Sequence, residues 1–319
     1  MRSRRRSLTL SRDRMTNPDS DGSMMRRWAP IMGRWSVAVE GLRYLGPQPD
    51  SVSPYGICVT SDDFSDGRVE ARVRFDGTEG GRILLGYRSL TERYLMVGLG
   101  GWRRAYTIGE FDPTFGWRGL SVGGTAENLS PTHWYDIKVT TTGQRISLSV
   151  DDVRVLEHIL DKPLTGGQVG LFAWGDKPVE FGPFAFDRRP GTVFVVMQFS
   201  EPYNQLYEDV IKPVTAAFGL RTYHAGDVFG PGLILHDVAQ GIVDAKVVVA
   251  EITPPNQNVF YDLGYAQALA KPTILLAERG KQLPFDISGY RVLFYDNTIG
   301  GKNQVEDGLK KHLTAILRE

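Results

Sequence analysis

Two carboxylate residues, Glu251 and Asp262, stand on either side of an asparagine-rich loop in the second half of the chain. Glu251 lies near the end of the apolar run 246–252, and Asp262 lies within 256–272, a stretch rich in small and aromatic residues. An apolar strand, a short Pro/Asn loop and a small-residue helix are typical of the carboxyl edge of a parallel α/β sheet, where ligands bind. We therefore expect a ligand site here, with these two carboxylates as its candidate catalytic groups.

Each of these residues also has an ordinary structural explanation. Asp262 can interact with the helix dipole in the first turn of its helix, and Glu251 can cap or pair with a neighbour. Asn256 and Asn258 can be turn and N-cap residues. Their combination at one expected sheet edge favours a binding site, while catalysis stays open.

The elements that must position these side chains alternate between strands and helices. Residues 193–197 form a continuous apolar run, and 203–218 repeats apolar residues at helical spacing. The elements expected after them are strand 221–224, helix 232–243, strand 246–250, helix 259–270, strands 273–277 and 292–295, and helix 305–317. This alternation predicts a flavodoxin-like α/β domain with a mostly parallel sheet covered on both faces.

The first half of the chain has a different period. In 68–75 apolar and charged residues alternate, as in a strand with one buried and one wet face. Comparable segments occur at 94–99, 134–140 and 145–150, separated by turns rich in Gly, Asp and Thr. Many short strands of this kind predict an all-β sandwich.

The change of pattern near residue 188 divides the chain into two expected domains. A β-sandwich would occupy 28–187 and the α/β domain 191–319. Residues 1–27 are rich in Arg and Ser and poor in apolar side chains, which predicts a disordered basic leader. A tail that touches an anionic surface is the alternative for this leader.

Composition limits the classes of function. The 319 residues carry 37 Lys and Arg against 37 Asp and Glu, a neutral balance that argues against bulk nucleic-acid binding. The single cysteine, Cys58, excludes an internal disulfide and fits a reducing, cytoplasmic setting. No apolar run suffices to span a bilayer, and the five histidines lack metal spacing. We expect no metal, no cofactor, and neither a membrane nor a nucleic-acid partner.

Longer stretches resemble two known families. Phe64-Ser-Asp-Gly-Arg-Val-Glu-Ala-Arg-Val73 and Gly167-Gln-Val-Gly-Leu-Phe172 resemble segments of the concanavalin A-like, laminin-G-like jelly roll. Ala245-Lys-Val-Val-Val-Ala-Glu-Ile-Thr253 and Asn256-Gln-Asn-Val-Phe-Tyr-Asp-Leu-Gly-Tyr-Ala266 resemble the nucleoside 2-deoxyribosyltransferase-like family, whose fold is shared with TIR-type NAD-cleaving domains. Further segments similar to the second family are 195–199, 207–213, 271–276 and 283–291.

The second resemblance implies chemistry at an N-glycosidic bond. In that family a helix glutamate attacks the anomeric carbon, and a strand-end aspartate assists at the base. A carboxylate can trap or stabilise the oxocarbenium-like centre, and the leaving base needs a proton. Here the helix position is Asp262, one methylene shorter, and the strand-end position is Glu251, one longer. The paired exchange either preserves the carboxylate geometry or marks a pocket that binds without cleaving.

The same resemblance implies a substrate-binding set. Its members are Phe199, Ser200, Tyr203, Asp227, Asn256, Asn258 and Tyr265. Backbone N–H groups near Phe199 and Ser200 would hold a phosphate or ribose hydroxyl, and the two tyrosines would stack on a base. Asp227 lies where the family's loop covers the sugar. Members of this family often complete the pocket across a subunit interface, which implies a homo-oligomer.

An aromatic cluster in the first half suggests a second, weaker site. Its members, in a Gly-rich stretch, are Trp102, Tyr106, Phe111, Phe115 and Trp117. Rings on a loop can stack on a sugar, which makes Trp102 and Trp117 candidate glycan contacts. A hydrophobic cluster packed beneath a long loop is the alternative.

Two hypotheses about function follow. In the first, the C-terminal domain cleaves or transfers an N-glycosidic bond of a nucleoside, nucleotide or NAD-like substrate, with Asp262 as nucleophile and Glu251 assisting. The sandwich would then be a regulatory or targeting module, as in effector proteins of bacterial defence. In the alternative, a non-catalytic nucleotide-sensing domain is coupled to a sandwich that binds a glycan or protein.

Overall fold

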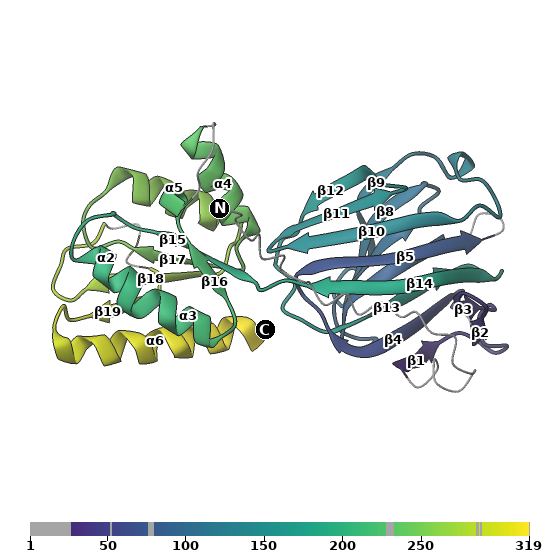
Figure 1. Cartoon of the computed structure of the whole chain (residues 1–319), viewed down its shortest axis with the longest axis horizontal. Coiled ribbons are helices and arrows are strands. Elements are labelled where there is room, and N and C mark those ends of the chain that lie inside the picture. The colour runs from purple at the N-terminus through teal and green to yellow at the C-terminus, as the bar shows by residue number, and fades with distance from the viewer. Residues whose placement is uncertain are drawn as a thin grey trace, which may run out of the picture.

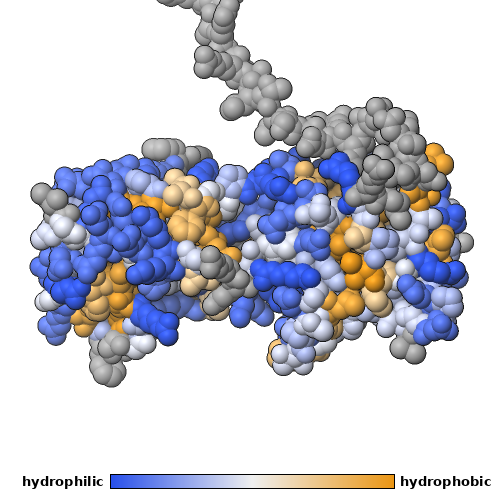
Figure 2. All heavy atoms as spheres, turned by 90° about the horizontal axis from the view of Figure 1, so that it is seen from below, coloured by the Kyte–Doolittle hydropathy of each residue, from blue (hydrophilic) through white to orange (hydrophobic). Residues whose placement is uncertain are grey.

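The chain folds into two lobes that meet at one seam (Figure 1). The computed structural model describes residues 27–51, 53–75, 80–227, 233–284, 287 and 289–318. The basic leader predicted at 1–27 lies outside these residues except for Arg27. Figure 2 shows one face of the molecule, where hydrophobic side chains gather in separate patches within a mostly hydrophilic surface.

The first lobe is a sandwich of two antiparallel sheets, which confirms the predicted all-β jelly-roll class. The first sheet runs β1 (Trp28–Met32), β4 (Tyr55–Asp63), β13 (Gln168–Trp174), β6 (Gly80–Tyr87), β7 (Tyr94–Leu99), β8 (Tyr106–Asp112) and β9 (Gly116–Gly123). The second runs β12 (Val153–Ile159), β11 (Arg145–Val150), β10 (Tyr135–Thr142), β5 (Gly67–Phe75), β14 (Val179–Arg188), β3 (Gly41–Tyr44) and β2 (Trp35–Ala38). A short 3-10 turn, η2 (Ala126–Asn128), interrupts the strands.

The alternating pattern of β5 explains how the sheets pack. Val69, Ala71, Val73 and Phe75 are buried, and the charged residues between them are only partly covered. The buried set joins a single large core between the two sheets. One face of the strand therefore turns inward and the other toward solvent, as its period predicts.

The second lobe is the predicted α/β domain. Its five parallel strands are ordered β16 (Arg221–Tyr223), β15 (Thr192–Val196), β17 (Val247–Glu251), β18 (Thr273–Glu278) and β19 (Val292–Tyr295). Its helical segments are α2 (Tyr203–Leu206), the π-helix η3 (Tyr207–Ile211), α3 (Lys212–Ala217), η4 (Ala225–Asp227), α4 (Ile234–Asp244), α5 (Gln257–Ala268) and α6 (Ile299–Arg318). Helix α6 begins six residues before the expected start at 305. A hydrophobic cluster covers each face of the sheet.

A hairpin turn of the sandwich forms much of the seam. The backbone N–H of Gln144 donates to the Val243 carbonyl at 3.2 Å, and its side chain donates to the Leu269 carbonyl at 3.0 Å. Arg145 Nε lies 2.8 Å from Asp244 Oδ1. These carbonyls belong to the carboxyl ends of α4 and α5, where backbone acceptors lack partners within the helix. The β10–β11 turn therefore caps two helices of the other lobe.

Two further features fix the seam. A Cβ on Gly143 would lie 2.5 Å from the Asp244 carbonyl oxygen, and the glycine has a φ of +58°. A side chain is excluded there on both grounds. Lys246 pairs with Asp66 at 2.9 Å and donates to Ser65 Oγ at 2.6 Å. The lobes are thus held by direct polar contacts as well as by the short connection between β14 and β15.

Candidate functional site

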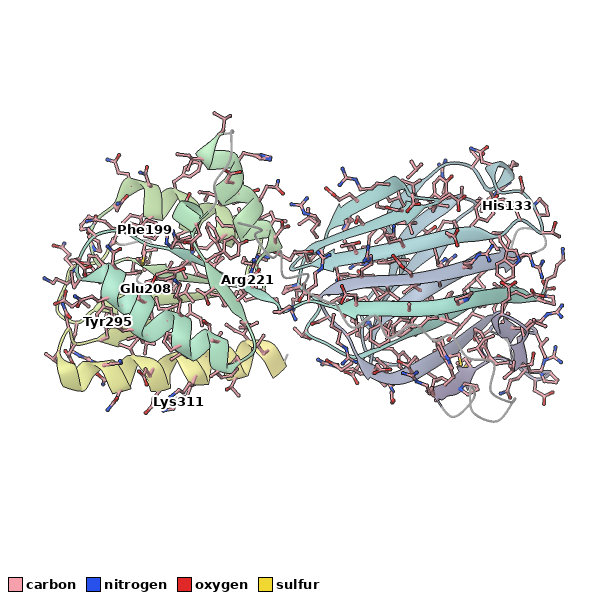
Figure 3. All side chains as sticks on the ribbon, in the orientation of Figure 1. His133, Phe199, Glu208, Arg221, Tyr295 and Lys311 are labelled. Atoms are coloured by element: carbon pink, nitrogen blue, oxygen red, sulfur yellow. The ribbon has the colours of Figure 1, made fainter. Side chains whose placement is uncertain are left out.

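The crevice expected for a ligand lies between β15 and β17. The chain leaves β15 for β16 on one side and then crosses to β17 on the other, so the strand order reverses between these two neighbours. Ligands of open α/β sheets bind at such a point, outside the carboxyl ends of the strands. Figure 3 places Phe199 and Tyr295 toward the end of the lobe away from the sandwich, and Arg221 toward the sandwich. The carboxyl edge therefore faces away from the seam.

Glu251, the last residue of β17, is fully buried at this edge. Its Oε1 accepts a hydrogen bond from the Thr253 backbone N–H at 2.8 Å, and Oε2 has no hydrogen bond of normal geometry to any described residue. Burial raises the pKa of Glu251 to about 7, although Thr253 and the Tyr295 hydroxyl act in the opposite direction. The side chain can therefore hold or release a proton near neutral pH.

Two tyrosines approach this carboxyl group. Burial and the Glu251 carboxylate both raise the pKa of Tyr295. The pKa of Tyr203 is raised by burial and by the charges of Glu251 and Glu278. Thr253 Oγ1 in turn accepts the Glu278 backbone N–H at 2.7 Å. These five residues, Glu251, Thr253, Tyr203, Glu278 and Tyr295, form what we call the Glu251 cluster.

Only Glu251 and Tyr203 of this cluster are candidates from the sequence. Thr253, Glu278 and Tyr295 were missed, although each stands at or just beyond the carboxyl end of a parallel strand. That position is itself a usable signal, since parallel strands deliver their carboxyl ends to one edge.

Asp262 lies on α5, half-buried, with a pKa raised to about 6 by burial. The helix begins at Gln257, which puts Asp262 in the second turn, where the dipole effect has faded. The spacing of Asn258, Asp262 and Tyr265 at i, i+4 and i+7 places them on one helix face.

Asn256 is the N-cap of α5. Its Oδ1 accepts from the backbone N–H groups of Asn258 at 3.0 Å and Val259 at 3.5 Å. Its Nδ2 lies 3.4 Å from Gln198 Oε1, and Gln198 donates to Ser200 Oγ at 2.9 Å. Asn256 therefore acts structurally, since it starts the helix and joins the loops that follow β15 and β17. The side chain of Asn258 is exposed.

Phe199 and Asp227 belong to a second group at the same edge. Phe199 is 46% exposed and its ring lies 4.2 Å from the His224 ring. Asp227 Oδ2 accepts from the Tyr207 hydroxyl at 3.1 Å and from the His224 backbone N–H at 3.0 Å. Burial lowers the pKa of His224, and its Nδ1 accepts the Gly226 backbone N–H at 2.9 Å. Asp227 thus shapes the loop after β16, and neither of its partners could be identified from the sequence pattern.

The two candidate glycan contacts of the sandwich differ in surroundings. Trp117 packs among aromatic rings on the outer face of the first sheet, with Tyr55 at 5.2 Å and Phe111 at 5.3 Å between ring centroids. Trp102 is 43% exposed, and a Cβ on Gly109 would lie 2.8 Å from its ring. The Trp102 ring therefore lies over β8 with one side open.

The loop that carries Trp102 is tightly held. Gly100, Gly101, Trp102 and Arg103 all have positive φ, which costs energy at the two non-glycine positions. The Gly100 carbonyl accepts hydrogen bonds from Arg82 Nη2 and from Thr107 Oγ1, both at 2.8 Å. Because the buried Arg82 and Thr107 side chains hold this strained loop, the Trp102 ring is presented in one orientation.

Neither a metal centre nor a membrane helix is found in the part of the chain that the structure describes. Its His, Cys, Asp and Glu side chains form no group of three or more that could hold a metal ion. None of its helices combines the length and apolar character needed to cross a bilayer.

Comparison with family models and with curated proteins gives no match. Solved structures that are similar include the carbohydrate binding module CBM66 from Bacillus subtilis, at 16% identity over 50% of this chain and 94% of that one, with a TM-score of 0.44. A β-glucanase of Bacillus licheniformis is 12% identical over 55% and 95%, with a TM-score of 0.38. The galectin LEC-6 of Caenorhabditis elegans is 15% identical over 46% and 96%, with a TM-score of 0.33. The matched half is the sandwich, and none of these matches transfers a function to this chain.

The raised pKa of Glu251 predicts a pH-dependent stability difference. In the folded state the Glu251 carboxyl group keeps its proton up to about pH 7, whereas the ordinary pKa of a glutamate is 4.5. Between these two pH values the unfolded state loses the proton and the folded state retains it, so the wild type loses stability as pH rises from about 4.5 to about 7. The free energy of unfolding of Glu251→Gln, relative to that of the wild type, should therefore rise by on the order of 3 kcal/mol from pH 4 to pH 8. Urea unfolding at both pH values measures it, with the exposed Glu208→Gln as control. A wild-type-to-variant difference that stays constant with pH would contradict the burial of an ionisable Glu251.

Proposed function

We propose that the α/β lobe cleaves or transfers the N-glycosidic bond of a nucleoside, nucleotide or NAD-like molecule. The observation that carries this proposal is Glu251, a fully buried carboxyl group with a pKa of about 7 at the carboxyl edge of the sheet. Such a group is a proton donor at neutral pH, and a departing base needs a proton. Its Oε2 accepts no hydrogen bond of normal geometry from any described residue, although the Tyr295 hydroxyl is near enough to lower the Glu251 pKa, so this oxygen is only weakly satisfied.

Asp262 supplies the second role. With a pKa of about 6 it is mostly ionised at pH 7, whereas Glu251 is about half protonated. Two carboxyl groups whose environments separate their pKa values can serve as base or nucleophile and as acid. The Asp262 carboxylate would bond to the anomeric carbon as the base leaves with the Glu251 proton. Water or an acceptor hydroxyl would then displace Asp262 and return its proton to Glu251.

The surroundings fit a substrate with a planar base and a polar sugar. The exposed rings of Phe199 and Tyr265 and the partly exposed ring of Tyr203 provide flat apolar surfaces. The exposed Asn258 amide and the Ser200 hydroxyl provide polar groups suited to sugar hydroxyls. This combination is typical of small-molecule sites, where a few polar groups fix orientation within an apolar lining.

Release of free base should depend on both carboxyl groups. With NAD and a panel of nucleosides and nucleotides, chromatography should detect base from the wild type, and Asp262→Asn should lower the rate at least a hundredfold. Glu251→Gln should lower it less for substrates whose base leaves readily. Both variants should keep substrate affinity, and Glu208→Gln should match wild type. Undiminished base release by Asp262→Asn would remove Asp262 from the mechanism.

The rate should have a bell-shaped dependence on pH. Activity needs ionised Asp262, which forms above about pH 6, and protonated Glu251, which is lost above about pH 7. The optimum of kcat/KM should therefore lie between pH 6 and 7. In Glu251→Gln the residual activity should lose its alkaline limb and keep its acid limb. A wild-type rate that rises steadily from pH 6 to 9 would refute this assignment of acid and nucleophile.

Nucleotide sensing without turnover is the second candidate function. The exchange of carboxylate lengths favours it, because a shorter Asp262 and a longer Glu251 can bind a ligand without completing the reaction. The base-release assay distinguishes the two functions. Sensing is supported when no panel member is cleaved while one of them raises the melting temperature of the wild type.

For the sandwich we propose a glycan contact centred on Trp102, consistent with a regulatory or targeting role. The supporting observation is the open ring of Trp102 on a strained, firmly bonded loop. Trp102→Ala should weaken binding to a soluble oligosaccharide at least tenfold, because the stacking surface is lost. Titration followed by intrinsic fluorescence across an oligosaccharide panel measures this, with the exposed Phe115→Ala as control. Equal losses in both variants, or binding untouched by Trp102→Ala, would exclude Trp102 as the platform.

A further inference from the structure

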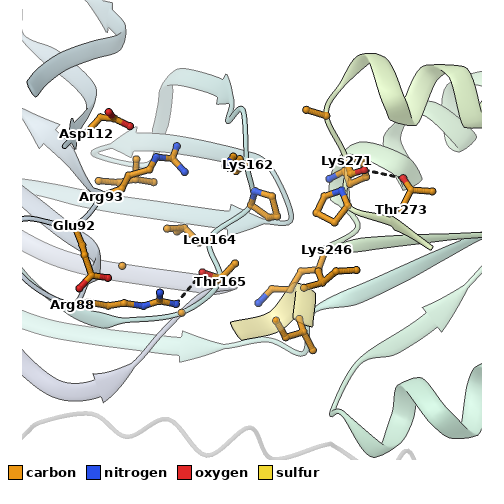
Figure 4. Close-up of a pocket in the computed structure, with 18 of the residues that line it drawn as sticks. Arg88, Glu92, Arg93, Asp112, Lys162, Leu164, Thr165, Lys246, Lys271 and Thr273 are labelled. Atoms are coloured by element: carbon orange, nitrogen blue, oxygen red, sulfur yellow. Dashed lines mark hydrogen bonds between the residues drawn. The ribbon is translucent and has the colours of Figure 1, made fainter. Parts of the chain in front are cut away.

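A cleft of about 880 Å³ lies between the two lobes (Figure 4). On one side the sandwich contributes Arg88, Arg93 and Lys162, and on the other the α/β lobe contributes Lys246 and Lys271. Its volume falls in the range of small-molecule sites. Neither the carboxylates of the proposed catalytic site nor the glycan candidates line it.

The cleft is separate from the proposed catalytic edge. Lys246 immediately precedes β17, and Glu251 ends that strand. At about 3.3 Å per residue the two positions are roughly 16 Å apart. The cleft therefore lies at the amino edge of the sheet, opposite the switch-point crevice.

Positive charge dominates the lining. Six Lys and Arg residues line the cleft, Arg88, Arg93, Lys162, Lys246, Lys271 and Arg291, against two carboxylates, Glu92 and Asp112. Lys271 contributes least, because its Nζ donates to the Val243 and Ala245 carbonyls and burial lowers its pKa to about 7. Two of these cations pair with carboxylates that do not line the cleft: Arg93 pairs with Glu110 at 2.7 Å, and Lys246 pairs with Asp66 at 2.9 Å. Lys162 and Arg291 are exposed and form no ion pair with any described side chain. The cleft thus keeps unneutralised cations on both walls.

Apolar side chains make up the rest of the wall. Pro163 and Leu164 line it from the sandwich, and Pro272 and Ile316 line it from the α/β lobe. A ligand that fits this lining has an anionic group and a less polar body. The seam contacts of Gln144 and Arg145 hold the two walls in register, so the cleft exists before any ligand arrives.

We propose that this cleft binds an organic phosphate of about nucleotide size, held by Lys162 and Arg291 from opposite lobes. Phosphate oxygens accept several charge-assisted hydrogen bonds at once, which suits ammonium and guanidinium groups on facing walls. The ligand would act as an effector that joins the lobes. It would touch Gln267 and Lys271 near the end of α5, the helix that carries Asp262.

The test is calorimetric titration of the full chain with tripolyphosphate, ATP and uncharged adenosine. Tripolyphosphate and ATP should bind, and raised salt should weaken both. Lys162→Ala/Arg291→Ala should weaken tripolyphosphate binding at least tenfold. Lys177→Ala/Lys311→Ala, which removes two exposed lysines outside the cleft, should leave it unchanged. Both pairs are surface changes, and unliganded melting temperatures should match wild type.

Three results would overturn the proposal. Tripolyphosphate binding that survives Lys162→Ala/Arg291→Ala, or that falls equally in the control pair, would show that the cleft does not select the anion. Loss of binding in Phe199→Ala, which removes an exposed ring at the catalytic edge, would move the site to that edge. The readout does not depend on turnover, so this proposal and the N-glycosidase proposal can fail separately.

Discussion

Burial of the central parallel strands on both faces constrains the whole second lobe. Every residue of β15 and β17 is buried, with a hydrophobic cluster on each side of the sheet. Polar groups can therefore meet water or a ligand only at the two ends of these strands, because helices cover both faces. The carboxyl ends gather the Glu251 cluster. The amino ends face the sandwich and form the seam and the cleft, so the two edges are free to serve different purposes.

Glu251 is where this constraint is most costly. A carboxyl group at the end of a buried strand loses its hydration, and one backbone N–H at 2.8 Å together with nearby hydroxyls does not replace it. An apolar residue at this position would pack without that penalty. Burial of a titratable group without full hydrogen bonding is more common where chemistry or binding uses it. The energetic cost at Glu251 is therefore the strongest physical argument that this edge has a function.

Much of the fold could be predicted from the sequence because it depends on local period. Alternation in β5 and continuous apolar runs in β15 and β17 identify the two sheets directly. The candidate site was predictable only in part. The end of a strand can be located from the sequence, but the side chains from other strands that lie beside it cannot. Tyr295 lies 44 residues beyond Glu251 in the chain, and only the parallel order of β17, β18 and β19 brings its strand end to the same edge. Trp102 and Trp117 look alike in sequence, and only packing separates an open ring from a covered one.

Helix α5 links the two edges of the lobe. It begins at the Asn256 cap beside the loops of the candidate site and ends near Leu269, whose carbonyl accepts from Gln144 of the sandwich. Its 12 residues span about 18 Å, and Asp262 lies midway. Both ends of the helix are thus fixed by side-chain amides, one from its own lobe and one from the other. A shift of the sandwich would remove a hydrogen bond from the end of α5, and a rigid helix transmits such a shift along its axis. The position of Asp262 consequently depends on contacts made by both lobes, which gives the sandwich a physical route to the candidate site.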